Sequence, residues 1–164
     1  MCARDGRFVD RFSMGQKIVL RLLLVAFCLV GLIAVFRHDA LWGWIYLGVL
    51  TLGQAVLVVP NLCARCPYPY EYNDCLFVPA GLLRTLVPRR TSPMGPAGKG
   101  ALLAGAGALV VIPQYALFQE PLLLILFWAL LLPFLGFFPL YLCRHCRHTG
   151  CPANRTGGGE PFTG

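Results

Sequence analysis

Residues 18–59, IVLRLLLVAFCLVGLIAVFRHDALWGWIYLGVLTLGQAVLVV, decide the fold of this chain. They hold two apolar runs, 18–36 and 41–59, each close to the roughly 20 residues that a helix needs to cross a bilayer core. Two further apolar runs follow at 101–118 and 121–142, again separated by a very short turn. The sequence therefore predicts an all-α integral membrane protein, a four-helix bundle made of two repeated transmembrane hairpins.

The composition supports a membrane protein and excludes two other classes. Of the 164 residues, 57% are hydrophobic and 13% are charged, whereas a soluble domain carries about 25% charged residues. A disordered chain is excluded because it would contain many more charges and far fewer apolar residues. The first run is too long for the apolar part of a signal peptide and lacks a cleavage site, so we expect a retained span.

The apolar runs divide the chain into five parts. We expect a cytoplasmic basic N-terminal arm, a first hairpin with its cysteine motif, a cytoplasmic linker, a second hairpin with its cysteine motif, and a disordered tail. Their ranges are 1–17, 18–75, 76–100, 101–151 and 152–164.

The basic residues predict the orientation. Thirteen of the 14 precede the first span, start it, or follow the second and fourth spans, and only Arg37 lies between spans one and two. Positive residues favour the cytoplasmic side, so both termini and the central linker are expected there, in the cell inner (plasma) membrane. Arg21, near the start of the first span, is expected to extend toward that face. No nucleic-acid-binding motif accompanies the positive charge, which instead suits anionic lipid headgroups of the bilayer.

Each hairpin ends in a similar cysteine motif. The first runs into Cys63-Ala64-Arg65-Cys66 with Cys75 following, and the second into Cys143-Arg144-His145-Cys146 with Cys151 following. Two direct repeats with an even number of spans keep the same orientation, so both motifs are expected at the cytoplasmic face. A compact bundle would bring them within reach of each other.

These cysteines predict a metal site. A C-x2-C pair places two thiolates on one ion, and two pairs make a four-cysteine site for zinc or an iron–sulfur cluster. The expected core ligands are Cys63, Cys66, Cys143 and Cys146, with Cys75 and Cys151 as the next candidates. Such a site would make this a binding or accessory protein that docks a cytoplasmic or membrane protein partner. His145 and His148 are possible further ligands, although solvated histidines at the interface are the simpler interpretation.

Three other interpretations remain open. The cysteine pairs suit a membrane thiol oxidoreductase, a soft-metal transporter or metal-handling protein, or sites of palmitoylation. Cytoplasmic thiols are kept reduced, which disfavours a permanent disulfide framework. The pairs follow helix C-termini, where the helix dipole disfavours thiolate, and this favours a bound cation over a reactive thiol. Cys28, in the middle of a span, is expected to be a packing residue.

The cysteine segments also carry a family resemblance. Cys63-Ala64-Arg65-Cys66-Pro67-Tyr68 and Cys143-Arg144-His145-Cys146, continuing to Cys151-Pro152-Ala153-Asn154, resemble segments of small, cysteine-rich, four-span membrane proteins of prokaryotes. That group has no assigned activity, so the resemblance implies four spans and no mechanism. Four-span disulfide-forming oxidoreductases also carry C-x2-C pairs, but on the oxidising side, opposite to the side expected here.

The remaining features of the spans indicate packing. Small residues recur at every fourth position of the third span (Gly100, Ala104 and Ala108, with Ala101 and Gly105), which favours close helix contact. The polar residues noted within the spans are Thr51, Gln54, Gln114 and Tyr115. No carboxylate lies deep in a span, which argues against a proton-coupled pump.

Overall fold

The computed structural model describes residues 12–90, 92 and 95–137. Within them every element is helical, which confirms the predicted all-α class. The long α-helices are α1 (Met14–His38), α6 (Pro96–Leu117) and α7 (Pro121–Leu135). The second limb is continuous but changes form along its length. Its elements are α2 (Ala40–Gly48), the π-helix η1 (Val49–Val58), α3 (Val59–Leu62) and the 3₁₀ turn η2 (Cys63–Arg65). Two short helices, α4 (Pro67–Glu71) and α5 (Ala80–Leu86), follow the second limb.

Three of the four predicted spans are long and apolar enough to cross a membrane. They are Met14–His38, Ala40–Arg65 and Pro96–Leu117. The fourth, α7, has 15 residues, and residues 138–142 of the predicted run 121–142 lie outside the described residues. Helix α6 begins at Pro96, five residues before the predicted run, because proline suits the first helical turn, where no amide partner is needed. Part of the expected linker is also helical, since it contains α5.

Side-chain caps define the start of α1 and the turn between α1 and α2. Ser13 and Gln16 form a reciprocal capping box at the start of α1. Asp39 has extended backbone angles, and its carboxylate accepts from the amides of Leu41 (2.7 Å) and Trp42 (3.3 Å). One residue therefore ends α1 and begins α2, which explains the tightness of this turn.

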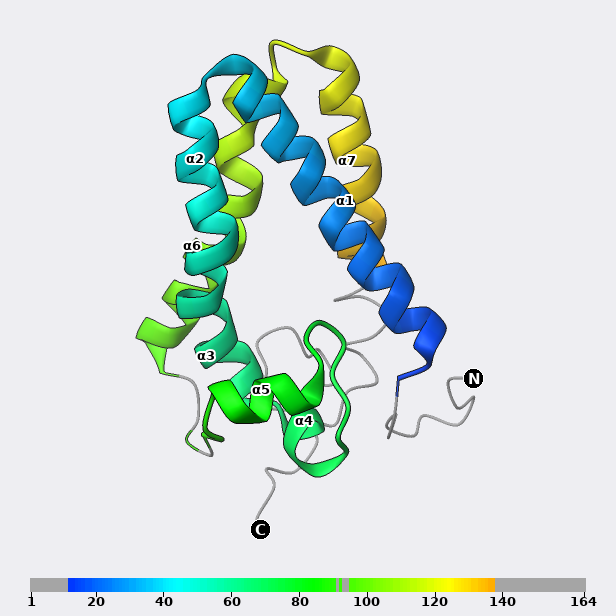
Figure 1. The fold of residues 1–164 in the computed structure, drawn as a ribbon, viewed down its shortest axis with the longest axis vertical. Coiled ribbons are helices and arrows are strands. Elements are labelled where there is room, and N and C mark those ends of the chain that lie inside the picture. The colour runs from blue at the N-terminus through cyan, green and yellow to red at the C-terminus, as the bar shows by residue number, and fades with distance from the viewer. Residues whose placement is uncertain (1–11, 91, 93–94, 138–164) are drawn as a thin grey trace.

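The long helices pair across the two predicted hairpins. Helix α1 packs most extensively against α7, and α6 packs against η1, whereas α6 and α7 hardly touch. Figure 1 shows the two pairs side by side, meeting at the end that carries the interhelical turns and diverging toward the end that carries α4 and α5. The molecule is therefore a wedge, closed at the turn end. There, the exposed Arg37 and the half-buried Glu120 link the two turns through a 3.3 Å ion pair.

All four limbs meet near Gly31 of α1. A Cβ atom at this position would lie 3.1 Å from the Tyr46 hydroxyl oxygen, 3.3 Å from Phe127 Cε2 and 3.3 Å from Pro113 Cβ. Tyr46 is completely buried and donates a 2.8 Å hydrogen bond to the carbonyl oxygen of Leu109. That carbonyl would ordinarily accept from residue 113, but proline has no N–H. Tyr46 thus satisfies an acceptor that Pro113 leaves without its helical donor.

The outer surface of the wedge is apolar on every limb. Large hydrophobic side chains on α1 face outward at successive turns, at Ile18, Leu22, Val25, Leu29 and Ile33. The other limbs do the same, with Trp44, Leu52, Leu103, Val111, Leu122, Ile125 and Leu132 exposed. A water-soluble protein rarely exposes such continuous apolar area. This surface, with three helices of sufficient length, indicates a membrane protein.

Polar side chains within the limbs bond to backbone carbonyls. Thr51 donates to Leu47, Gln114 donates to Val110, and Gln54 crosses from η1 to the carbonyl of Gly105 on α6 at 3.0 Å. A Cβ on Gly105 would lie 3.0 Å from Val58 Cγ2, which confirms the predicted close contact at this position. A Cβ on Gly100, by contrast, would meet nothing within 4 Å.

Candidate functional site: the cysteine-bearing cap

Two of the predicted site residues lie on one turn at the end of the second limb. Cys63 begins η2, and Cys66 precedes Pro67 as the N-cap residue of α4. The Cys66 amide donates to the Cys63 carbonyl at 3.2 Å, so the C-x2-C pair is held as a compact turn. Cys63 is 6% exposed. Proline after Cys66 disfavours continued helix at that residue, which explains why the second limb ends there.

The chain then reverses and returns along α4. We call residues 72–78 the strap. The amides of Tyr72 and Asp74 both donate to the carbonyl of Tyr68, at 3.2 and 3.1 Å. Asn73, between them, has a φ of 50°, a left-handed conformation that asparagine tolerates better than most residues. This reversal brings Cys75, the third predicted residue, back toward the Cys63–Cys66 turn.

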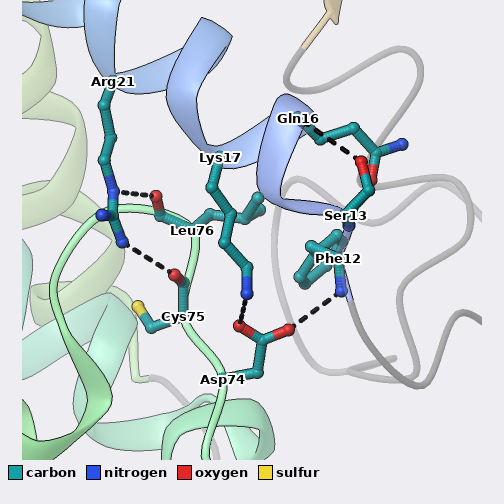
Figure 2. A network of polar contacts seen from close by, with 8 residues as sticks. All are labelled: Phe12, Ser13, Gln16, Lys17, Arg21, Asp74, Cys75 and Leu76. Carbon is teal, nitrogen blue, oxygen red and sulfur yellow. Dashed lines mark hydrogen bonds and ion pairs between the residues drawn. The ribbon is translucent and has the colours of Figure 1, made fainter.

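Helix α1 holds the strap through two basic side chains, Lys17 and Arg21, shown in Figure 2. Lys17 forms an ion pair with Asp74, and the second oxygen of Asp74 accepts from the Phe12 amide at 2.9 Å. Arg21 donates to the carbonyl oxygens of Leu76 (2.9 Å) and Cys75 (3.2 Å). Arg21 therefore extends toward this end of the molecule, as the sequence predicts, and bonds the strap there. The Lys17 and Asp74 side chains are only 17% and 6% exposed, so water screens their attraction weakly.

Arginine 84 of α5 holds α4 in the same manner. Its guanidinium donates to the carbonyls of Pro69 (2.6 Å) and Tyr70 (3.1 Å). The Tyr70 hydroxyl donates to the Val87 carbonyl at 2.7 Å, which ties α4 to the end of α5. Nearby, Arg89 forms an ion pair with Glu71. Residues 63–90 therefore form a structured cap over the divergent end of the wedge.

The three cysteines of the first motif influence the ionisation of Tyr70. Partial burial is the largest cause that raises the pKa of the Tyr70 phenol above its ordinary value. Negative charge on Cys63, Cys66 and Cys75 raises this pKa further, and Arg89 lowers it. The fold therefore brings all three thiols within electrostatic reach of a single side chain.

The described residues alone do not provide a metal site. Across residues 12–90, 92 and 95–137, no three His, Cys, Asp or Glu side chains are grouped so that they could hold an ion. No disulfide joins any two cysteines in this part of the chain. Cys143, Cys146 and Cys151, together with His145 and His148, lie outside the described residues. Cys28 packs against the hydrophobic core, in agreement with its expected packing role.

Sequence reasoning missed two features that the structure supplies. One is the buried Tyr46, whose hydroxyl meets the carbonyl freed by Pro113. The other is the bonding of the strap by Lys17 and Arg21. The spacing of four residues places Lys17 and Arg21 on one face of the helix, which indicates a shared contact, but it did not identify Asp74 as the partner. The chain matches no protein-family model, no curated protein and no solved structure.

Proposed function

We propose that this chain is a multi-pass plasma-membrane protein whose cytoplasmic cap presents a cysteine-ligated metal, zinc or an iron–sulfur cluster, to a protein partner. The observation that carries this proposal is the compact turn that holds the C-x2-C pair of Cys63 and Cys66 at one end of the wedge, closed by the 3.2 Å hydrogen bond from the Cys66 amide to the Cys63 carbonyl. Thiolates in such proximity repel one another, and a bound cation relieves that repulsion. The lipid bilayer is the partner of the apolar outer surface.

The charge distribution supports an orientation with both termini in the cytoplasm. Basic side chains lie at the cap end, at Lys17, Arg21, Arg65, Arg84, Arg89 and Arg90. At the opposite end Arg37 is paired with Glu120, so its charge is compensated. A positive cap end and a neutralised turn end match the distribution expected of cytoplasmic and external faces.

Cysteine labelling in intact cells tests the orientation. The exposed Gln119, in the turn between α6 and α7, is replaced by cysteine, and the unaltered chain with its eight cysteines is the matched control. An impermeant maleimide is expected to label the Gln119→Cys variant in intact cells and the unaltered chain only after the membrane is permeabilised. Labelling of the unaltered chain in intact cells would show the opposite orientation and would restore the disulfide-forming oxidoreductase as the better interpretation.

Ligands from the second cysteine motif complete the proposed site. The described part of the chain ends at Phe137, after α7 has run from the turn toward the cap end (Figure 1). Cys143 is the sixth residue after Phe137, and an extended segment of this length spans at most ~20 Å. Cys63, Cys66, Cys143 and Cys146 are the proposed core ligands, with Cys75 and Cys151 next. Since no described group of three side chains can hold an ion, ligands from both motifs are needed.

Metal analysis of anaerobically purified protein tests the site. We expect about one zinc ion or one cluster per chain, lost in Cys63→Ser and in Cys143→Ser. Cys28→Ser is the matched control, because it removes a thiol that packs in the core, and it should retain the metal. A metal-free, colourless protein with reduced thiols would contradict the proposal. Catalytic thiol–disulfide turnover by such a protein would identify the oxidoreductase, and uptake of a soft metal into vesicles would identify the transporter.

A further inference from the structure

We propose that Arg21 and Lys17 of α1 are positioning residues for the Cys75 thiol of the cap. Lys17 and Arg21 are one helical turn apart and bond to three consecutive residues of the strap, 74 to 76. Through them, a helix that packs against α7 bonds the segment of the cap that carries Cys75.

Arg21 of α1 bonds the strap at Cys75 and Leu76. Helix α4 holds the strap as far as Asp74, whose amide donates to the Tyr68 carbonyl. Beyond that residue the Cys75 and Leu76 carbonyls accept from Arg21, at 3.2 and 2.9 Å. A guanidinium that donates to two adjacent carbonyls fixes the direction of the backbone as well as its position. Cys75 therefore follows the residue that pairs with Lys17, Asp74, and its own carbonyl and that of Leu76 are bonded by Arg21.

The other two thiols are fixed by different contacts. The Cys63–Cys66 turn is closed by its own backbone hydrogen bond, and the Arg90 amide donates to the carbonyl of Ala64 at 2.9 Å. Neither contact involves α1. The contact of Arg21 and Lys17 with the strap therefore helps to set the separation between Cys75 and the Cys63–Cys66 pair, together with the packing of Leu76 and Phe77 against the core. Groups that orient metal ligands in this way typically change metal affinity ~10–100-fold when they are removed.

One part of this inference rests on the proposed metal site, namely that the position of Cys75 affects metal affinity. A cobalt titration of the full chain in detergent tests that part. With Cys75 as one of the ligands of that site, we expect Arg21→Ala to weaken Co²⁺ binding ~10–100-fold, with Lys17→Ala acting in the same direction. Arg84→Ala is the matched control, since it also removes an arginine that bonds two adjacent carbonyls, but on α4. It should leave the affinity unchanged. In a Cys75→Ser background Arg21→Ala should cause no further loss, whereas a general weakening of the fold would add to the loss.

Cross-linking tests the positioning without any metal. Dibromobimane, a short reagent that joins two thiols, is expected to link Cys75 to Cys66 in the unaltered chain and in Arg84→Ala, as measured by mass spectrometry. The yield should fall severalfold in Arg21→Ala. If the unaltered chain binds no Co²⁺ but cross-linking still depends on Arg21, the metal site is refuted and the positioning stands. If the link does not form in the unaltered chain, or forms equally in Arg21→Ala, or is lost equally in Arg84→Ala, the positioning is refuted.

Discussion

The hydrogen bond from Tyr46 to Leu109 predicts a specific energetic coupling between Tyr46 and Pro113. Tyr46→Phe keeps the buried ring but removes the 2.8 Å hydrogen bond to the Leu109 carbonyl. Because Pro113 has no N–H, this carbonyl then loses its remaining strong donor. The variant should therefore be less stable than the unaltered protein, although its packing is preserved.

The magnitude follows from two opposing considerations. An unpaired buried acceptor costs about 1–3 kcal/mol in soluble proteins. Interhelical hydrogen bonds in membranes average about 0.6 kcal/mol and reach about 1.7 kcal/mol, because the unfolded state also finds partners. Tyr46 is completely buried and Leu109 is 9% exposed, so water cannot replace the lost donor. We therefore expect a cost near the upper membrane value, about 1.5 kcal/mol.

Pro113→Ala provides the decisive comparison. Alanine restores the helical N–H to the Leu109 carbonyl, so removing the Tyr46 hydroxyl in that background should cost about 0.5 kcal/mol or less. The four proteins of this double-mutant cycle are unfolded reversibly in mixed micelles with increasing SDS, followed by far-ultraviolet circular dichroism. Tyr115→Phe, at an exposed position on α6, controls for the loss of a hydroxyl group alone. An equal cost of Tyr46→Phe in the proline and alanine backgrounds would refute the reasoning.

Three further predictions concern the contacts between limbs and the cap. Gly105→Ala should destabilise the protein by about 1–3 kcal/mol in the same assay, because its Cβ would lie 3.0 Å from Val58 Cγ2. Gly107→Ala, which meets nothing within 4 Å, should be neutral or slightly stabilising, and equal effects would contradict the close contact. A double-mutant cycle on the largely exposed Arg37–Glu120 pair should give a coupling of about 0.2–1 kcal/mol that decreases with added salt; a coupling unaffected by salt would argue against an exposed ion pair. In an absorbance titration at 295 nm, Tyr70→Phe should remove a tyrosine whose pKa lies above the ordinary value of 10.0. The stability that the neutral phenol contributes is present below the ordinary pKa and is lost as the pH rises through the higher pKa of the folded state. If the substitution instead removes a tyrosine with an ordinary pKa, the partial burial of Tyr70 is contradicted.

The sequence predicts the helical limbs well because span length and turn chemistry are local properties. The run 18–36 lies within α1, and Asp39 is a strong N-cap residue at the position where the two limbs meet. The pairing of α1 with α7 was not predictable in the same way. The limbs are apolar on nearly all sides, so hydrophobic periodicity does not identify the packed face. Close contacts at single glycines, such as Gly31 and Gly105, mark the packed faces instead.

The candidate site was predictable only in part. The C-x2-C spacing located Cys63 and Cys66 at the end of the second limb, where the structure has them. The ion pair between Lys17 and Asp74 joins residues 57 positions apart in the sequence. The periodicity of hydrophobic residues does not predict such a long-range pairing. The π-helical form of η1 also has no simple local code, since its residues would suit an α-helix equally well.

The pairing of the first limb with the last has a consequence for biosynthesis. During translation α1 and α2 are made long before α7, because α7 begins only at Pro121. Until then Phe27 of α1 lacks its edge-to-face contact with Phe127 at 5.8 Å. A nascent chain released before residue 121 would expose that face of α1 to lipid or to quality-control factors. Assembly of the wedge is therefore complete only after α7 has been made. A truncated product would be recognisable to the cell as unassembled.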